Sequence, residues 1–273
     1  MHYPVALMCR VYGVTRGGYY AWIGRGPSKR DKENASLSEQ IRQVHQASRG
    51  TYGSPRVYRK LQQQGVAVSE NRVARLMSLL GLKGRWATLR YTSPSLKKFY
   101  GSLPNQQIEH PAAATNQVWV ADITYLKVGA IYRYLAVVMD RCSRRIIGWA
   151  FGQQKNAALT LRALNNAVSK RRPPPGLIFH TDRGSEYYAN VFRARIAQLN
   201  ITQSMIRPGK VTDNAFMESF FHSMKADVIH GNKFKEDSQM LSVLKSYIPF
   251  YNHSRIHSSL NYVSPATYEN LLA

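Results

Sequence analysis

Apolar residues at helical spacing dominate the first ninety residues of the chain. Residues 1–26 predict two short helices separated by Gly13, and residues 27–35 read as a charged linker. Three further helices are predicted, the last two of which begin at a capping serine and end at a glycine. They cover residues 38–47, residues 56–64, and the segment between Ser69 and Gly81.

The last of these helices carries Arg72 and Arg75 away from its apolar stripe. Three short helices with an arginine-bearing third one are typical of a helix-turn-helix DNA reader. We therefore expect residues 36–90 to be a DNA-binding region, after an N-terminal segment over residues 1–35, with both arginines in contact with DNA. A basic three-helix adaptor that holds the chain's own catalytic domain is the alternative.

Strand-like patterns begin after residues 91–113, whose prolines and alanines predict a linker. Three apolar runs with tight connections predict consecutive antiparallel strands. A fourth strand follows a helix, so a crossover should make it parallel to its neighbour. With a short fifth strand, residues 114–273 predict an α/β domain built on a mixed five-stranded sheet with flanking helices. The five strands are expected at residues 118–126, 132–139, 146–151, 177–180 and 201–206.

A helix beginning near Thr212 or Asp213, either of which is a suitable N-cap, has two contrasting faces. Its aromatic residues and methionine fall in one apolar arc that needs a core. Glu218 and Lys225 lie on the opposite side. A solvent-exposed carboxylate on a surface helix would explain Glu218 alone, but two acids upstream stand where acids are costly.

Charge adds the expectation of a nucleic-acid partner. The chain has 273 residues, 38 Lys and Arg against 15 Asp and Glu, a net charge of +23 and a pI of about 10.2. Such an imbalance exceeds what solubility requires and favours a polyanion such as DNA. Two distant cysteines exclude a cysteine-rich zinc module and fit the cytoplasm. No apolar run is long enough to span a bilayer, so no membrane is expected.

Three carboxylates form the candidate catalytic site. Asp122 lies within the most apolar strand, Asp182 ends the fourth strand, and Glu218 is on the helix described above. An ionised carboxylate in such a strand is costly unless a cation compensates it. Ligand sites lie at the carboxyl ends of parallel strands. If the three acids meet there, their mutual repulsion and oxygen donors favour hard divalent cations, Mg²⁺ or Mn²⁺.

Three motifs in the catalytic part resemble the retroviral-integrase-like DDE transposases, and more closely the second-frame protein (OrfB) of the IS3 insertion-sequence family. The acids are 60 and 36 positions apart in order. Two further motifs, one in the helical part and one near the C-terminus, extend the resemblance over nearly the whole chain. The five motifs span residues 119–125, 180–187, 213–221, 51–56 and 251–265.

The resemblance implies an RNase H-like (integrase-core) fold and a transposase that uses two metal ions for DNA cleavage and strand transfer. By family analogy, Asp122 would bridge both metals, with Asp182 and Glu218 holding one each. Lys225 is then expected to reach a DNA end, and Arg255 to contact DNA. Glu186 departs from the family, which commonly has glutamine there. This acid could alter metal affinity or lie on the surface.

The resemblance also implies partners for the chain. Transposition joins two element ends, so a homo-oligomer on DNA is expected, and the family usually supplies an upstream-frame (OrfA-type) protein, separate or fused by frameshifting. The chain has no long heptad run of its own. Two other functions stay open: a non-catalytic DNA-binding regulator, and an RNase H-type nuclease without strand transfer.

Overall fold

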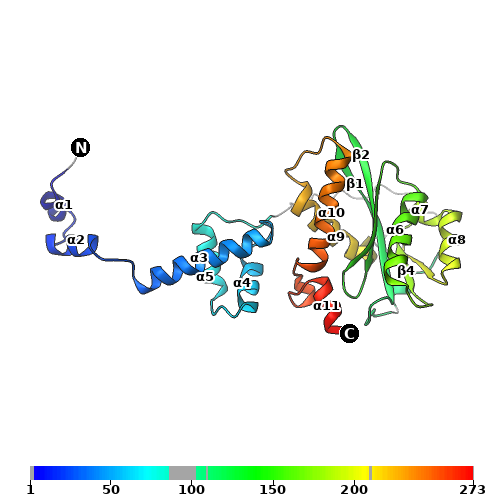
Figure 1. Ribbon diagram of the computed structural model, residues 1–273, viewed down its shortest axis with the longest axis horizontal. Coiled ribbons are helices and arrows are strands. Elements are labelled where there is room, and N and C mark those ends of the chain that lie inside the picture. Colours follow the sequence, from blue (N-terminus) through cyan, green and yellow to red (C-terminus); the bar gives the residue numbers. More distant parts are fainter. Residues whose placement is uncertain (1–2, 86–102, 109, 209–210, 273) are drawn as a thin grey trace. The chain divides into compact units, whose positions relative to one another are not determined.

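The computed structural model describes residues 3–85, 103–108, 110–208 and 211–272 (Figure 1). The chain divides into two compact units, Met1–Lys83 and Gly84–Ala273. Most of the predicted linker over residues 91–113 lies outside the described residues. Within the described part of the chain, no helix is both long and apolar enough to cross a bilayer.

In its described residues, the first unit contains helices and no strands, as the sequence predicts. Three of its helices pack together through buried residues that include Ile41, Val57, Leu61 and Val73. Ser69 accepts a hydrogen bond from the backbone N–H of Arg72 and so caps the third of them. The helices are α1 (Val5–Val11), α2 (Arg16–Ile23), α3 (Lys29–Ala47), α4 (Ser54–Gln63) and α5 (Glu70–Leu79).

The charged linker predicted over residues 27–35 is wrong for most of that range. Helix α3 already begins at Lys29, because Ser28 and Asp31 form a capping box in which each side chain binds the other's backbone N–H. Capping of this kind satisfies two backbone donors that a helix start otherwise leaves exposed. The charges that suggested a linker lie on the exposed side of a helix instead.

The second unit contains a five-stranded sheet in the order β3-β2-β1-β4-β5. The first three strands pair antiparallel, while β4 and β5 run parallel to β1. The mixed sheet predicted from the sequence is therefore confirmed. Its strands are β1 (Val118–Val128), β2 (Ile131–Asp140), β3 (Ile146–Gly152), β4 (Ile178–Thr181) and β5 (Thr202–Met205).

Helices cover both faces of this sheet, and each face has its own apolar core (Figure 1). On one face lie α6 (Ala157–Arg171) and α8 (Asn190–Gln198), after the short helix α7 (Ser185–Tyr188). On the other lie α9 (Ala215–Met224) and α10 (Asp237–His253). The remaining elements are α11 (Pro265–Leu272), the short 3₁₀ helices η1 (Gln106–Ile108), η2 (Val211–Asn214) and η4 (Ser258–Leu260), and the π-helical segment η3 (Lys225–Ile229).

Candidate active site

Asp122 lies on β1, and Asp182 directly follows the end of β4, the parallel strand beside it. In the register between β1 and β4, Ala121 is opposite Thr181. Asp122 is the residue after Ala121, and Asp182 is the residue after Thr181. Neighbouring strands are about 4.8 Å apart. The side chain of Asp122 belongs to the face covered by α9 and α10, because its cross-strand partner Val137 is part of the core on that face. The structure thus brings two of the three predicted acids together.

The turn after β4 holds a further acid against Asp182. The backbone N–H of Gly184 donates to Asp182 Oδ1 at 3.0 Å. A Cβ on Gly184 would lie 3.0 Å from that oxygen and 2.6 Å from Glu186 Oε1, so a larger residue would push the two carboxylates from these positions. Glu186 is 5% exposed, which excludes the surface position considered from the sequence.

Lys155 is the counter-ion of Glu186. Its Nζ lies 2.8 Å from Glu186 Oε1. Burial alone would lower the pKa of Lys155, but the hydrogen bond and charge of Glu186, together with the charges of Asp182 and Asp122, raise it overall. Tyr187 lies near the same acids, and its pKa is raised well above the usual value by burial first and by the three carboxylates second. Sequence reasoning missed Lys155 because its partner is far along the chain.

Helix α9 is anchored at its start beside Asp122. The side-chain amide of Asn214 donates to the backbone carbonyl of Ala121 at 3.2 Å. Glu218 follows Asn214 by four residues, so it lies about one turn further along the same side of the helix. Its side chain is exposed, although partial burial raises its pKa.

Lys225 lies near Asp122, just past the end of α9. Its Nζ is 4.7 Å from the ring centre of Tyr125. Burial lowers the pKa of Lys225, and the charge of Asp122 opposes that change. Contacts from Asn214 and Lys225 therefore tie both ends of α9 to the strand that carries Asp122, and Glu218 lies between them in the chain.

A complete metal-ligand set is not formed by the side chains as they stand. Among the residues that the structure describes, no group of three or more His, Cys, Asp or Glu side chains is arranged to hold a metal ion. Asp122 and Asp182 nevertheless provide adjacent carboxylate oxygens, which are the donors that hard cations prefer. Their ligand roles, and that of Glu218, stay predictions.

Comparison with known proteins identifies the family. Residues 112–211 and residues 199–265 match two descriptions of the integrase core domain, and residues 31–88 match an HTH-like domain. The "Insertion element IS600 uncharacterized 31 kDa protein" of Shigella sonnei is 37% identical, with 96% of this chain and 97% of that protein covered. "Transposase InsF for insertion sequence IS3A" of Escherichia coli is 34% identical, with 98% and 94% covered. The chain belongs to the IS3 family of insertion-sequence transposases.

A third relative agrees with this assignment. "Transposase for insertion sequence element IS904" of Lactococcus lactis is 36% identical, and the match covers 90% of this chain and 98% of that protein. Among solved structures, the HTLV-2 integrase catalytic core domain in complex with magnesium is 15% identical over 57% of this chain and 97% of that one, with a TM-score of 0.43. The family assignment gives the transposase its function in DNA transposition and integration, and its integrase core supports polynucleotidyl transfer.

Arg255, expected from the sequence to contact DNA, is instead a buried structural residue. It is 3% exposed, and its Nε lies 2.7 Å from Asp227 Oδ2. Tyr247 donates to the same oxygen at 2.8 Å. The prediction was wrong because the partner acid lies in another segment of the chain, where nothing local to Arg255 reveals it.

The proposed N-cap of the α9 segment also needs correction. Asp213 does not cap the helix; its carboxylate binds Arg207, with Nη2 and Oδ1 2.9 Å apart, and accepts from Asn105. These bonds hold the pKa of Asp213 down to about 2. The chain enters α9 through the short turn η2, with Asn214 at the N-cap position.

The two arginines of the helical region differ in their surroundings. Arg72 turns back onto α3, where its Nη2 donates to Asn34 at 2.8 Å and lies 3.4 Å from Glu33. Arg75 is exposed on α5. The transposase therefore uses Arg72 within its helical unit, whereas Arg75 stays a predicted DNA contact.

Proposed function

We propose that this transposase cleaves DNA strands at the ends of its element and joins the freed 3′-hydroxyl to target DNA, at a site formed by Asp122, Asp182 and Glu218. The observation that carries the proposal is that Asp122 and Asp182 each follow the paired residues Ala121 and Thr181 of neighbouring parallel strands inside an integrase-core chain. Two buried or half-buried carboxylates side by side repel each other, and divalent cations relieve that repulsion.

Each residue of the proposed site would have its own role in holding metal or DNA. Asp122 would bridge two Mg²⁺ or Mn²⁺ ions, and Asp182 and Glu218 would hold one each. When bound, such ions stabilise the attacking and leaving oxygens of an in-line displacement at phosphorus. Lys225, beside Asp122, would bind a phosphate next to the scissile bond. Glu218 is exposed on α9 and would turn toward the aspartates when metal and DNA arrive.

The direct test is Asp122→Asn, which keeps the size of the side chain and removes its charge. Wild-type protein is expected to nick DNA that carries the element ends in a Mg²⁺-dependent reaction, and the variant to lose nicking by at least about a thousandfold, in line with loss of a residue on which both metals depend. DNA binding in EDTA should be unchanged. Nicking that persists in the variant would remove Asp122 from the mechanism.

Two further assays address the alternative functions. DNA with a pre-cut 3′ end should be joined to target DNA; free fragments without joined product would favour a nuclease that only hydrolyses. Tight binding without any Mg²⁺-dependent nicking or joining would favour a DNA-binding regulator. Each assay is run with and without an upstream-frame (OrfA-type) protein, because we propose that this partner assists end recognition and that the active form is an oligomer on DNA.

A further inference from the structure

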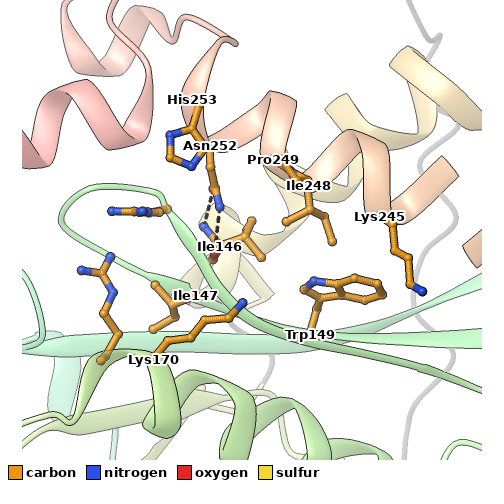
Figure 2. Close-up of a pocket in the computed structure, with 11 residues that line it drawn as sticks. Ile146, Ile147, Trp149, Lys170, Lys245, Ile248, Pro249, Asn252 and His253 are labelled. Atoms are coloured by element: carbon orange, nitrogen blue, oxygen red, sulfur yellow. Dashed lines mark hydrogen bonds between the residues drawn. The ribbon is translucent and has the colours of Figure 1, made fainter. Parts of the chain in front are cut away.

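A pocket separate from the acidic site opens at the outer edge of the sheet (Figure 2). It lies where the start of β3 meets the C-terminal end of α6 and the last turns of α10, and its volume is about 480 Å³. Trp149 and Lys245 lie together at one side of the pocket, and the side chain of Lys170 extends into the pocket from α6 (Figure 2). None of the acids of the candidate active site lines this pocket.

The positive charge in the pocket is only partly balanced. Arg145 and Arg171 both pair with Glu269, a buried acid on α11. Lys170 and Lys245 are exposed, and within the described residues neither makes an ion pair or a hydrogen bond. Arg171 is also within reach of the charge of Asp140, so both arginines have carboxylate partners and Lys170 and Lys245 carry the uncompensated charge that favours an anion in the pocket.

Side chains from α6 and α10 bind backbone groups of the edge strand beside the pocket. The side chain of Asn252 accepts from the N–H of Ile146 and donates to its carbonyl, both at 2.8 Å (Figure 2). Asn166 donates to the carbonyl of Trp149 at 3.0 Å. These side chains occupy the N–H and carbonyl of Ile146 and the carbonyl of Trp149, so a second strand would have to displace them in order to pair here. A second copy related by symmetry would also bring like charges together.

We infer that this pocket binds the sugar-phosphate backbone of DNA, outside the catalytic site. The inference rests on the proposed function, since it takes the same DNA as its ligand. Lysines bind phosphates as point charges, and the partly exposed ring of Trp149 offers an apolar surface to a sugar or a base. Trp149 lies opposite Val137, which lies opposite Asp122, so two strand spacings, about 10 Å, separate the outer Cα atoms. One DNA molecule can therefore contact both places.

The test compares two double variants of the full chain. Lys170→Gln with Lys245→Gln removes the two uncompensated cations, and Lys233→Gln with Lys235→Gln removes two exposed lysines outside the pocket. Binding of a fluorescent element-end DNA is measured by anisotropy in EDTA over a salt series. The pocket variant should bind at least about tenfold more weakly, with the slope of log affinity against log salt reduced by about 2, because two phosphate contacts are lost. The control variant should change far less.

Equal behaviour of the two variants would overturn the inference. So would a loss of self-association by the pocket variant, measured by light scattering, with DNA binding per protomer unchanged; the pocket would then hold a second copy. Melting temperatures identify any variant that fails to fold, and Lys170→Arg with Lys245→Arg, which keeps both charges, should then retain wild-type binding. Since binding is measured without divalent ions, failure here leaves the Asp122→Asn result intact, and failure of that result leaves the pocket intact.

Discussion

Lys155 and Glu186 form an ion pair, and replacing one or the other should lower the stability of the protein by different amounts. Their charged atoms are 2.8 Å apart, but the Lys155 side chain is 35% exposed and that of Glu186 only 4%. Lys155→Met leaves Glu186 charged, buried and beside Asp182. Glu186→Gln leaves an ammonium group that reaches water and still faces two aspartates.

The sizes of the two effects follow from burial. Breaking a fully buried pair by removing one partner costs about 3–5 kcal/mol. Water reaches this pair from the lysine side, so we expect Lys155→Met to cost about 2 kcal/mol and Glu186→Gln about 0.5–1 kcal/mol. For a unit of this size, about 2–4 °C accompanies each kcal/mol, which gives a fall of about 4–8 °C for the lysine variant. Adding Glu186→Gln to Lys155→Met should recover part of that loss.

Calorimetric melting of the full chain, with and without Mg²⁺, measures all three variants. The lysine variant should gain more stability from Mg²⁺ than wild type does, because its third carboxylate is uncompensated. Lys155→Arg, which keeps the charge, is the matched control. Equal losses for the two single variants, or a double variant whose loss equals the sum of theirs, would refute the reasoning, since either result means that the two charges are not coupled.

Three further predictions concern residues outside that pair. Arg255→Met should cost about 3–5 kcal/mol in urea unfolding because it leaves Asp227 buried and unpaired, whereas weaker DNA binding at unchanged stability would restore Arg255 as a DNA contact. Burial holds the pKa of His180 down to about 4, from 6.5, so between those values only the unfolded chain takes up that proton. The contribution of His180 to the free energy of unfolding is therefore fully present above pH 6.5 and falls by about 3 kcal/mol as the pH drops to 4. His180→Asn should flatten this dependence of stability on pH, and an unchanged dependence would contradict the assignment. Arg75→Gln should weaken DNA binding and lower the salt slope by about 1, whereas Arg72→Gln should mainly lower the melting temperature; the reverse pattern would exchange their roles.

The sheet could be predicted from the sequence because each strand carries its own signal. Apolar runs bounded by turns mark β1, β2 and β3, and a helix before β4 requires the parallel pairing that places Asp182 beside Asp122. Both aspartates could therefore be located from local pattern and topology alone. The capping box of Ser28 and Asp31 is also a local signal, and its serine-x-x-acid spacing could have extended α3 to its true start.

The ionic contacts could not be predicted in the same way. Arg255 looks like any other basic residue until the chain after α10 brings it onto Asp227. Lys155 and Glu186 meet because the segment before α6 lies beside α7. The sequence around a charged residue has no periodic pattern that indicates which residue will be its ion-pair partner. The excess of positive charge, which correctly favours DNA as a ligand, makes each individual arginine a poor guide to where DNA lies.

Lys155 and Lys225 both lie near Asp122, but they should contribute differently to the binding of DNA at the acidic site. Lys155 has its own counter-ion in Glu186, so the divalent cations proposed for Asp122 and Asp182 would leave it neutralised in place. Among the described residues, the ring of Tyr125 and the charge of Asp122 compensate the partial burial of Lys225. If cations neutralise Asp122 as proposed, Lys225 would lose that compensation and would gain most from a phosphate oxygen. Cation binding and DNA binding should therefore reinforce each other through Lys225 and not through Lys155.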